Sequence, residues 1–345
     1  MYILFMEENE LNMRKNIQKN KETISVVMGT YNGERFIREQ LDSILQQTVP
    51  AVEIIIQDDC STDHTYDILL EYTQKYPIIK LYRNSKNLGV NANFFNAISK
   101  AQGDFIAISD QDDIWNKNKL ELQIKSIGKN LLCGGRSVPF STGTGVARID
   151  MRIPNFNLIR WLFIGSISGH TMMLSRELLN KMPNVSSIPP YRFYDAILGM
   201  TAASFNSIVY LEEELVKHRR HIVAASYHKP TDNRMSVRNI CRNIIRTWKF
   251  HKTLKPEISR RLKVTHCFLQ AIDSKEQVRE DALRMIELYT GKSFFDWLSL
   301  EIFCIKHYNQ LFYSKVNLII GILRAIYFPV SLSEYYRYLL PKKQL

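Results

Sequence analysis

Between residues 24 and about 115, the chain alternates between short apolar runs and segments with helical spacing. The four runs, rich in branched apolar residues, are Ile24–Met28, Val52–Ile56, Ile78–Tyr82 and Asp104–Ser109. Short apolar runs of this kind form parallel strands that are buried on both faces. The alternation predicts an α/β fold, a mostly parallel sheet with helices on both of its faces.

Three of the four predicted strands end in a polar cluster. The clusters are Thr30-Tyr31-Asn32-Gly33, Gln57-Asp58-Asp59-Cys60-Ser61 and Asp110-Gln111-Asp112-Asp113. The carboxyl ends of parallel strands lie at one edge of a sheet, and ligands bind outside that edge. We therefore expect a functional site where the three clusters meet.

The polar clusters offer carboxylates in place of a glycine-rich phosphate loop. Neither G-x-x-x-x-G-K-[ST] nor G-x-G-x-x-G follows the first run, which disfavours a P-loop enzyme or a dehydrogenase. Carboxylates repel phosphate unless a divalent cation lies between them. Hard oxygen ligands suit Mg²⁺ or Mn²⁺, so the sequence predicts one of these cations as the cofactor.

Residues 24 to about 115 resemble the nucleotide-binding half of a family 2 glycosyltransferase, and the metal motif at 110–115, DQDDIW, resembles its rhamnosyltransferase-like branch. The resemblance implies a GT-A fold, which is Rossmann-like. It also implies an inverting transfer of a sugar from a dTDP or UDP donor to a hydroxyl of a glycan or lipid-linked acceptor in cell-surface polysaccharide synthesis. Rhamnose is the candidate sugar.

The resemblance assigns nucleotide-sugar binding to the strand-end clusters. The residues concerned are Thr30, Tyr31, Asn32, Asp58, Asp59 and Asp110. A carboxylate can accept the imide N–H of uracil or thymine, and a tyrosine offers a flat face to the base. The alternatives are a turn tyrosine that packs on its own sheet, and an acidic cluster that complements a helix dipole.

Asp110, Asp112 and Asp113 are the predicted metal residues. Three carboxylates within four positions repel one another and are costly without a cation. By resemblance, Asp110 and Asp112 form the D-x-D motif, with Asp110 nearer the ribose and Asp112 on the metal between the phosphates. Asp113 assists or holds the loop, and Trp115 packs the loop against the core. The alternative is a solvated acidic turn.

In the second half of the predicted domain, Asp195 falls where the family places an acidic residue that opens a helix. It is the candidate general base, which takes the proton of the acceptor hydroxyl. Ala196 and Ile197 stand where the family usually has tryptophans. A helix N-cap is the alternative role. His170 replaces a common asparagine, and a sugar contact and a strand-end histidine are equally open for it.

Arg219 and His221 lie in the basic segment 217–221, which resembles a family segment that neutralises the departing diphosphate. This segment follows a predicted strand, Ile208–Leu211, and an acidic turn, Glu212–Glu214. A basic loop without substrate contact is the alternative. From Leu131 to Arg160 the chain also departs from the family: Cys133-Gly134-Gly135-Arg136 is followed by a Ser/Thr/Gly-rich stretch up to Gly145, which we expect to be a loop.

Nearly all of the net charge of +12 lies after residue 235, because residues 236–345 hold 19 Lys+Arg and 9 Asp+Glu. Arg238, Arg242, Arg246 and Lys249 recur at helical spacing between apolar residues. This is typical of a basic amphipathic helix. In the later apolar segments, which Arg324 and Pro329 interrupt, the longest stretch without a charge or a proline has eight residues (316–323), against roughly 20 needed to span a bilayer.

We therefore expect three parts: a poorly ordered lead-in (1–22), a GT-A domain (23–235, with halves 23–115 and 116–235) and a helical region (236–345). The helical region would pack on the domain and rest on the inner face of the cytoplasmic membrane. An ordinary soluble bundle is the alternative. The five cysteines are dispersed and form no C-x-x-C pair, which fits a reducing cytoplasm.

Two other functions stay open. A nucleic-acid-binding protein is compatible with the basic region, although no zinc finger, RNA-recognition motif or heptad run supports it. A catalytically inactive sugar-nucleotide-binding relative is disfavoured by the intact Asp110 and Asp112. Nucleic acid is not an expected partner, and the sequence leaves the oligomeric state open.

Overall fold

The computed structural model describes residues 22–141, 151–163, 165, 167–184, 188–220, 237–313, 317–336 and 339. Three predictions fall on other residues. The lead-in lies outside the described residues except for Glu22, and the loop expected up to Gly145 lies outside them from residue 142. His221 also lies outside them.

The described residues form one eight-stranded mixed sheet with the order β3-β2-β1-β4-β7-β6-β8-β5. The strands are β1 (Ile24–Thr30), β2 (Glu53–Asp58), β3 (Ile79–Arg83), β4 (Phe105–Ser109), β5 (Ile114–Trp115), β6 (Leu132–Ser141), β7 (Met173–Ser175) and β8 (Ile208–Arg220). The four predicted strands are confirmed as β1 to β4, which pair in parallel, with Thr30 opposite Asp58. This register places the polar clusters at one edge.

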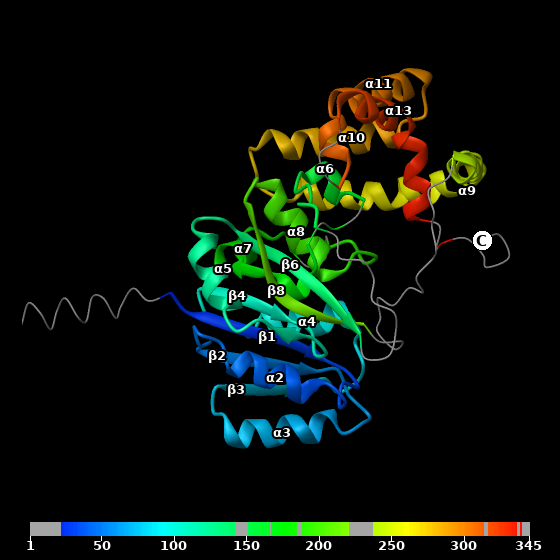
Figure 1. Cartoon of the computed structure of the whole chain (residues 1–345). Helices are drawn as coiled ribbons and strands as arrows, with labels where there is room; N and C mark the ends of the chain where they lie inside the picture. Colours follow the sequence, from blue (N-terminus) through cyan, green and yellow to red (C-terminus); the bar gives the residue numbers. More distant parts are fainter. Residues whose placement is uncertain are drawn as a thin grey trace, which may run out of the picture.

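Helices cover both faces of the sheet (Figure 1). Along β1, Val26 and Met28 point into one core and Val27 into the other, because successive side chains of a strand alternate. The first core takes residues from α2 (Ile37–Leu45), α3 (Thr65–Lys75) and α5 (Lys119–Ile127); the second takes residues from α4 (Val90–Ile98), α6 (Leu158–Trp161) and α8 (Tyr194–Ser204).

β8 corrects the prediction of a short strand followed by an acidic turn. The strand continues through the acidic residues to Arg220 and pairs in parallel with β6. Leu211 lies opposite Gly135 and Glu214 opposite Arg136, so Glu212 and Glu213 bulge out to solvent. The bulge keeps the carboxylates exposed without ending the strand. The expected loop after Arg136 is also wrong over 137–141, which belong to β6.

The helical region after residue 236 is observed, and it packs against α6 and α8 at the end of the molecule opposite α3 (Figure 1). Its helices are α9 (Val237–Gln270), α10 (Gln277–Thr290), α11 (Phe294–Lys306), α12 (Tyr308–Leu311) and α13 (Leu318–Tyr335). In α9, Phe250, Leu254, Ile258 and Leu262 recur every four residues and are buried. The apolar face of α9 therefore belongs to the core over this stretch.

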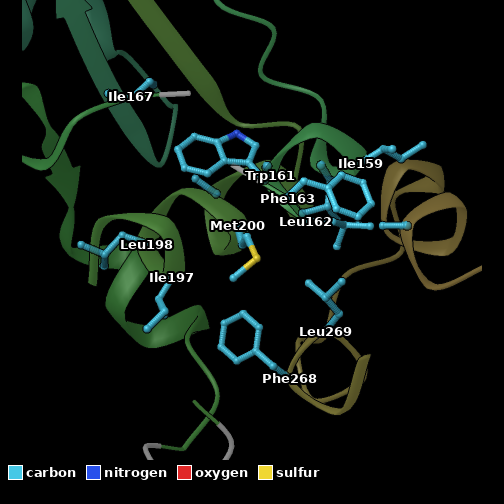
Figure 2. Packing of buried hydrophobic residues seen from close by; sticks show 14 of the residues in the cluster. Ile159, Trp161, Leu162, Phe163, Ile167, Ile197, Leu198, Met200, Phe268 and Leu269 are labelled. Atoms are coloured by element: carbon cyan, nitrogen blue, oxygen red, sulfur yellow. The ribbon is translucent and has the colours of Figure 1, made fainter. Parts of the chain in front are cut away.

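Trp161 of α6 lies in the part of this core that α8 and α9 share. Figure 2 shows its indole beside α8, near Met200 and Leu198, with Phe268 and Leu269 of α9 close to the same cluster. Gly199 makes the contact possible, because a Cβ added there would lie 2.2 Å from Cη2 of Trp161. The indole therefore lies directly on the backbone of α8.

We expect Gly199→Ala to lower the free energy of unfolding by about 1–3 kcal/mol, because the added methyl group overpacks this contact. Urea unfolding followed by circular dichroism measures the loss. In a Trp161→Phe background the smaller ring leaves room, so the same substitution should cost less. Equal costs in both backgrounds would contradict the direct contact.

Candidate functional site

Gln111 joins the turn after β1 to the turn after β4. Its Oε1 accepts a hydrogen bond from Tyr31 N (2.8 Å), and its Nε2 donates to Tyr31 O (2.9 Å). A Cβ on Gly33 would lie 2.4 Å from Gln111 Oε1, so a larger residue there would displace the Gln111 amide. Our sequence prediction missed Gln111, whose only signal was its place between two metal-site aspartates. The ring of Tyr31 is exposed at this edge.

Asn32 and Asp58 fix the neighbouring turn. Asn32 has φ of 50°, and its Oδ1 accepts from Thr62 N at 2.8 Å. Asp58 is fully buried, accepts from Thr30 Oγ1 (3.1 Å) and Ser61 N (3.0 Å), and pairs with Arg83 (Nε to Oδ2, 3.3 Å). Its carboxylate therefore already has several partners within the protein, and the predicted contact with a base stays a prediction.

Asp59 organises the start of α4. Its two oxygens accept from Leu88 N, Gly89 N and Asn84 Nδ2, each at 2.8 Å. Gly89 has φ of 83°, a conformation that glycine adopts without strain. The predicted nucleotide contact of Asp59 is also untested, and the structure places its carboxylate on the turn before α4.

The carboxylates of Asp110, Asp112 and Asp113 lie within 4.8 Å of one another. Asp113 is fully buried, and its Oδ1 accepts from Arg219 N and from His218 Nδ1, each at 3.0 Å. The positive charges of His170 and His218 and these hydrogen bonds overcome the effect of burial and hold the pKa of Asp113 below its usual value. The acidic cluster is thus partly buried, unlike a solvated turn.

Two stacked histidines cover the acidic cluster. The rings of His170 and His218 lie 4.8 Å apart and nearly parallel. His170 Nδ1 lies 3.4 Å from Asp110 Oδ2, and its Nε2 bonds Ser137 Oγ at 2.8 Å. Burial lowers the pKa of His170, but the nearby carboxylates outweigh it and raise the pKa to about 9. The sequence analysis left the role of His170 open and missed His218, because only the fold joins β8 to this edge.

Arg219 supports the acidic loop from β8. Its guanidinium lies between the rings of Phe36 and Phe140, donates to Asp112 O (2.9 Å) and pairs with Glu39 (2.5 Å). The side chain is almost fully buried. In this arrangement Arg219 positions the acidic loop through protein contacts, and its contact with the diphosphate stays a prediction.

Asp195 lies in the first turn of α8, whose N-cap is Phe193. The N-cap role considered for Asp195 is therefore not observed, although its Oδ1 accepts from Ala196 N at 2.7 Å. Burial raises the pKa of Asp195 to about 6, and the negative charge of Asp110 adds to this effect. The electrostatic influence of Asp110 links the predicted base to the acidic cluster.

Asn91, which the sequence analysis also missed, holds the chain on both sides of Phe193. Its Nδ2 donates to Arg192 O (2.7 Å), and its Oδ1 accepts from Tyr194 N (2.9 Å). Asn91 lies in the first turn of α4, directly after the turn held by Asp59. The first half of the domain, to which α4 belongs, therefore fixes the start of α8.

The donor set at this edge fits a hard divalent cation. Oδ2 of Asp113 is buried and has no hydrogen-bond partner among the described residues. Both histidine Nδ1 atoms already face carboxylates, so carboxylate oxygens are the groups that could take a cation. Oxygen ligands of this kind suit Mg²⁺ or Mn²⁺.

Residues 25–182 match the profile of Glycosyl transferase family 2. The putative teichuronic acid biosynthesis glycosyltransferase TuaG of Bacillus subtilis is 39% identical over 54% of this chain and 77% of its own. The dTDP-rhamnosyl transferase RfbG of Shigella flexneri is 34% identical over 44% of this chain and 55% of its own. The chain belongs to glycosyltransferase family 2.

The fold agrees with this membership. TarS residues 1–349 of S. aureus, solved with UDP-GlcNAc, align with a TM-score of 0.52 at 18% identity, over 93% of both chains. The GT-A fold expected from the sequence is therefore confirmed. Other relatives, uncharacterized mycobacterial proteins that are 30% identical, are matched over 62% of their length.

The raised pKa of Asp195 gives a stability prediction. The carboxyl group of Asp195 binds a proton more readily in the folded protein than in the unfolded chain. The free energy of unfolding therefore falls as the pH rises from about 4 through about 6. Asp195→Asn removes this penalty, and we expect it to be more stable than the wild type by about 2 kcal/mol at pH 8 and equal at pH 4. Urea unfolding in EDTA measures both values.

Asp104→Asn is the control of opposite sign, because hydrogen bonds from Thr23 hold the pKa of Asp104 below its usual value. It should lose stability near pH 7, whereas Asp195→Asn should gain it. A pH-independent difference between Asp195→Asn and the wild type would contradict the shift.

Proposed function

We propose that this protein is an inverting glycosyltransferase that transfers a sugar from a nucleoside-diphosphate donor to a hydroxyl acceptor in cell-surface polysaccharide synthesis. The observation that carries the proposal is an acidic cluster at the sheet edge whose charge acts on a second, buried carboxylate. Asp110 and Asp112 form a cluster fit for a cation, and burial together with the charge of Asp110 raises the pKa of Asp195 to about 6.

Asp195 is the general base of this proposal. With a pKa of about 6 it is ionised at neutral pH, yet it is more basic than an ordinary aspartate. It takes the proton of the acceptor hydroxyl as the oxygen attacks the anomeric carbon, and the diphosphate leaves from the opposite side. Direct displacement inverts the anomeric centre without a covalent intermediate.

The donor would lie along the edge formed by the turns after β1, β2 and β4. Asp112, with Asp110 and Asp113, would hold Mg²⁺ or Mn²⁺, which neutralises the charge of the departing diphosphate. Thr30, Tyr31 and Asn32 would contact the base and ribose, with Asp58 and Asp59 supporting or joining them. Arg219 and His221 complete the proposed set on the diphosphate side.

Rhamnose from dTDP-rhamnose is the proposed donor sugar, since the metal loop reads DQDDIW and the rhamnosyl transferase RfbG is among the relatives. UDP-sugars are the second choice for the donor. We place the enzyme at the inner face of the cytoplasmic membrane, where lipid-linked acceptors are reached. The basic helical region 236–345 supports this location, and the GT-A domain is proposed to span 23–235.

A donor screen tests the proposal. Release of nucleoside diphosphate is followed for dTDP- and UDP-sugars with lipid-linked acceptors, in Mg²⁺, Mn²⁺ or EDTA. We expect release with one donor, only in the presence of a cation. No turnover with any donor would contradict transfer. Salt-sensitive binding to duplex nucleic acid without any nucleotide-sugar effect would favour the nucleic-acid alternative instead.

Asp112→Asn should abolish cation-dependent donor binding and lower turnover by roughly 10²- to 10³-fold, since it removes a ligand of the charge-neutralising cation. Calorimetric titration of the nucleotide with and without Mn²⁺ measures the binding. Asp67→Asn, an exposed carboxylate on α3, is the control and should behave as the wild type. Unchanged Mn²⁺-dependent binding in Asp112→Asn would remove Asp112 from the metal site.

Asn91→Asp should lower kcat roughly ten- to hundredfold and leave the KM for the donor unchanged, because it breaks the bond to Arg192 O and shifts Asp195 from its working position. The matched control is Asn96→Asp, further along α4. Because a loss of folded enzyme would also lower the apparent kcat, circular dichroism of the same samples must show an unchanged folded fraction. An equal rise in donor KM would contradict a positioning role for Asn91.

A further inference from the structure

α11 and α13 present a large apolar face to solvent. Phe295 is 76% exposed and Ile319 is 74% exposed, far more than such side chains are in a core. The other exposed apolar residues on the two helices are Phe294, Trp297, Leu298, Ile302, Leu318, Ile320, Leu323 and Ile326. Contiguous exposed apolar surface of this kind marks an interaction site.

The two helices lie side by side and are firmly seated (Figure 1). On their inner sides Leu300, Cys304, Ala325 and Phe328 are buried in the main core. α11 begins with a complete capping box, in which Ser293 and Asp296 each accept from the other's backbone N–H. The exposed residues therefore belong to ordered helices whose opposite faces are already packed.

Positive charge accompanies this face. Arg324 is exposed between Leu323 and Ile326, and Lys292 and Lys306 flank α11. The guanidinium of Arg324 lies over the ring of Phe312, 4.1 Å from its centroid. On α11, Asp296 caps the helix, and burial raises the pKa of Glu301. The face is thus apolar, with exposed cations within and beside it.

These features favour one occupant over the alternatives. A symmetric contact between two copies would bring the same patch, with its exposed Arg324, against itself. α13 has the length and composition to cross a bilayer, with 39% of its residues buried inside the protein. Arg324 lies in the middle of α13, and the second half of this helix joins the core. The helix therefore suits an orientation along the membrane surface. Aromatic and aliphatic residues with flanking cations are typical of helices that lie in the lipid headgroup region.

We infer that the α11–α13 face is a docking surface for an anionic phospholipid bilayer, into which its aromatic and aliphatic side chains insert while Arg324, Lys292 and Lys306 meet lipid phosphates. The inference deepens the membrane location proposed above and names the surface. In α9, whose basic residues the sequence singled out, Phe250 and Leu254 face the core.

Flotation of the full-length protein with vesicles tests the inference. The probes are vesicles of phosphatidylcholine alone and of phosphatidylcholine with phosphatidylglycerol. We expect binding to the anionic vesicles and a blue shift of tryptophan fluorescence that Trp297→Phe largely removes. Phe295→Glu with Ile319→Glu should abolish binding. Leu70→Glu with Val52→Glu, two exposed apolar residues in the part of the chain that forms the opposite end of the molecule (Figure 1), introduces the same charge and should bind as the wild type.

Arg324→Gln should weaken binding to anionic vesicles roughly fivefold, as expected for one basic residue near the surface. Equal binding to neutral and anionic vesicles would overturn the role of the cations. No flotation, or a dimer in light scattering that Ile319→Glu dissociates, would overturn the bilayer as the occupant. Nucleoside diphosphate release is measured on the same samples, so that membrane docking and catalysis are tested separately. Loss of docking with intact donor turnover would leave the proposed transferase activity unaffected.

Discussion

The site depends on the burial of one carboxylate, Asp113. A buried charge is stable only when other groups compensate it, and here the partners come from separate parts of the chain. Arg219 N and His218 of β8 bond it, and His170 faces it from the segment before β7. The acidic loop after β4 is therefore tied to the second half of the sheet, and this tie holds Asp110 and Asp112 at the edge.

A second set of polar contacts connects the turn after β2 to the start of α8, where the predicted base lies. Asp59 fixes the turn before α4, and two residues into that helix Asn91 holds the backbone directly before Asp195. The segments are far apart in sequence, but α4 packs between β1 and α8. One side-chain amide thus sets the position of Asp195 relative to the turns where the donor is proposed to lie.

The sequence was sufficient to predict those features that depend on a local pattern of residues. The apolar runs of β1 to β4 and the strand-end clusters are read from neighbouring residues, and the sheet brings them together as expected. His218 and Gln111 were missed because their partners lie 105 and 80 residues away, where no periodicity reports a contact. The acidic turn at Glu212–Glu214 was wrong for a related reason. Charged residues typical of turns are accommodated in a strand when the partner strand allows a bulge.

α8 connects the site to the helical region. Its first turn carries Asp195 and is held by Asn91, while at its other end Ser274, just after α9, donates a 2.5 Å hydrogen bond to Ser204 O. Between these ends Trp161 lies on Gly199. Because a helix is a rigid element, a displacement of α9 or α10 relative to the sheet would act on the end that bears Asp195. Docking through α11 and α13, which pack on the same core, would therefore bear on the position of the proposed base as well as on the location of the enzyme.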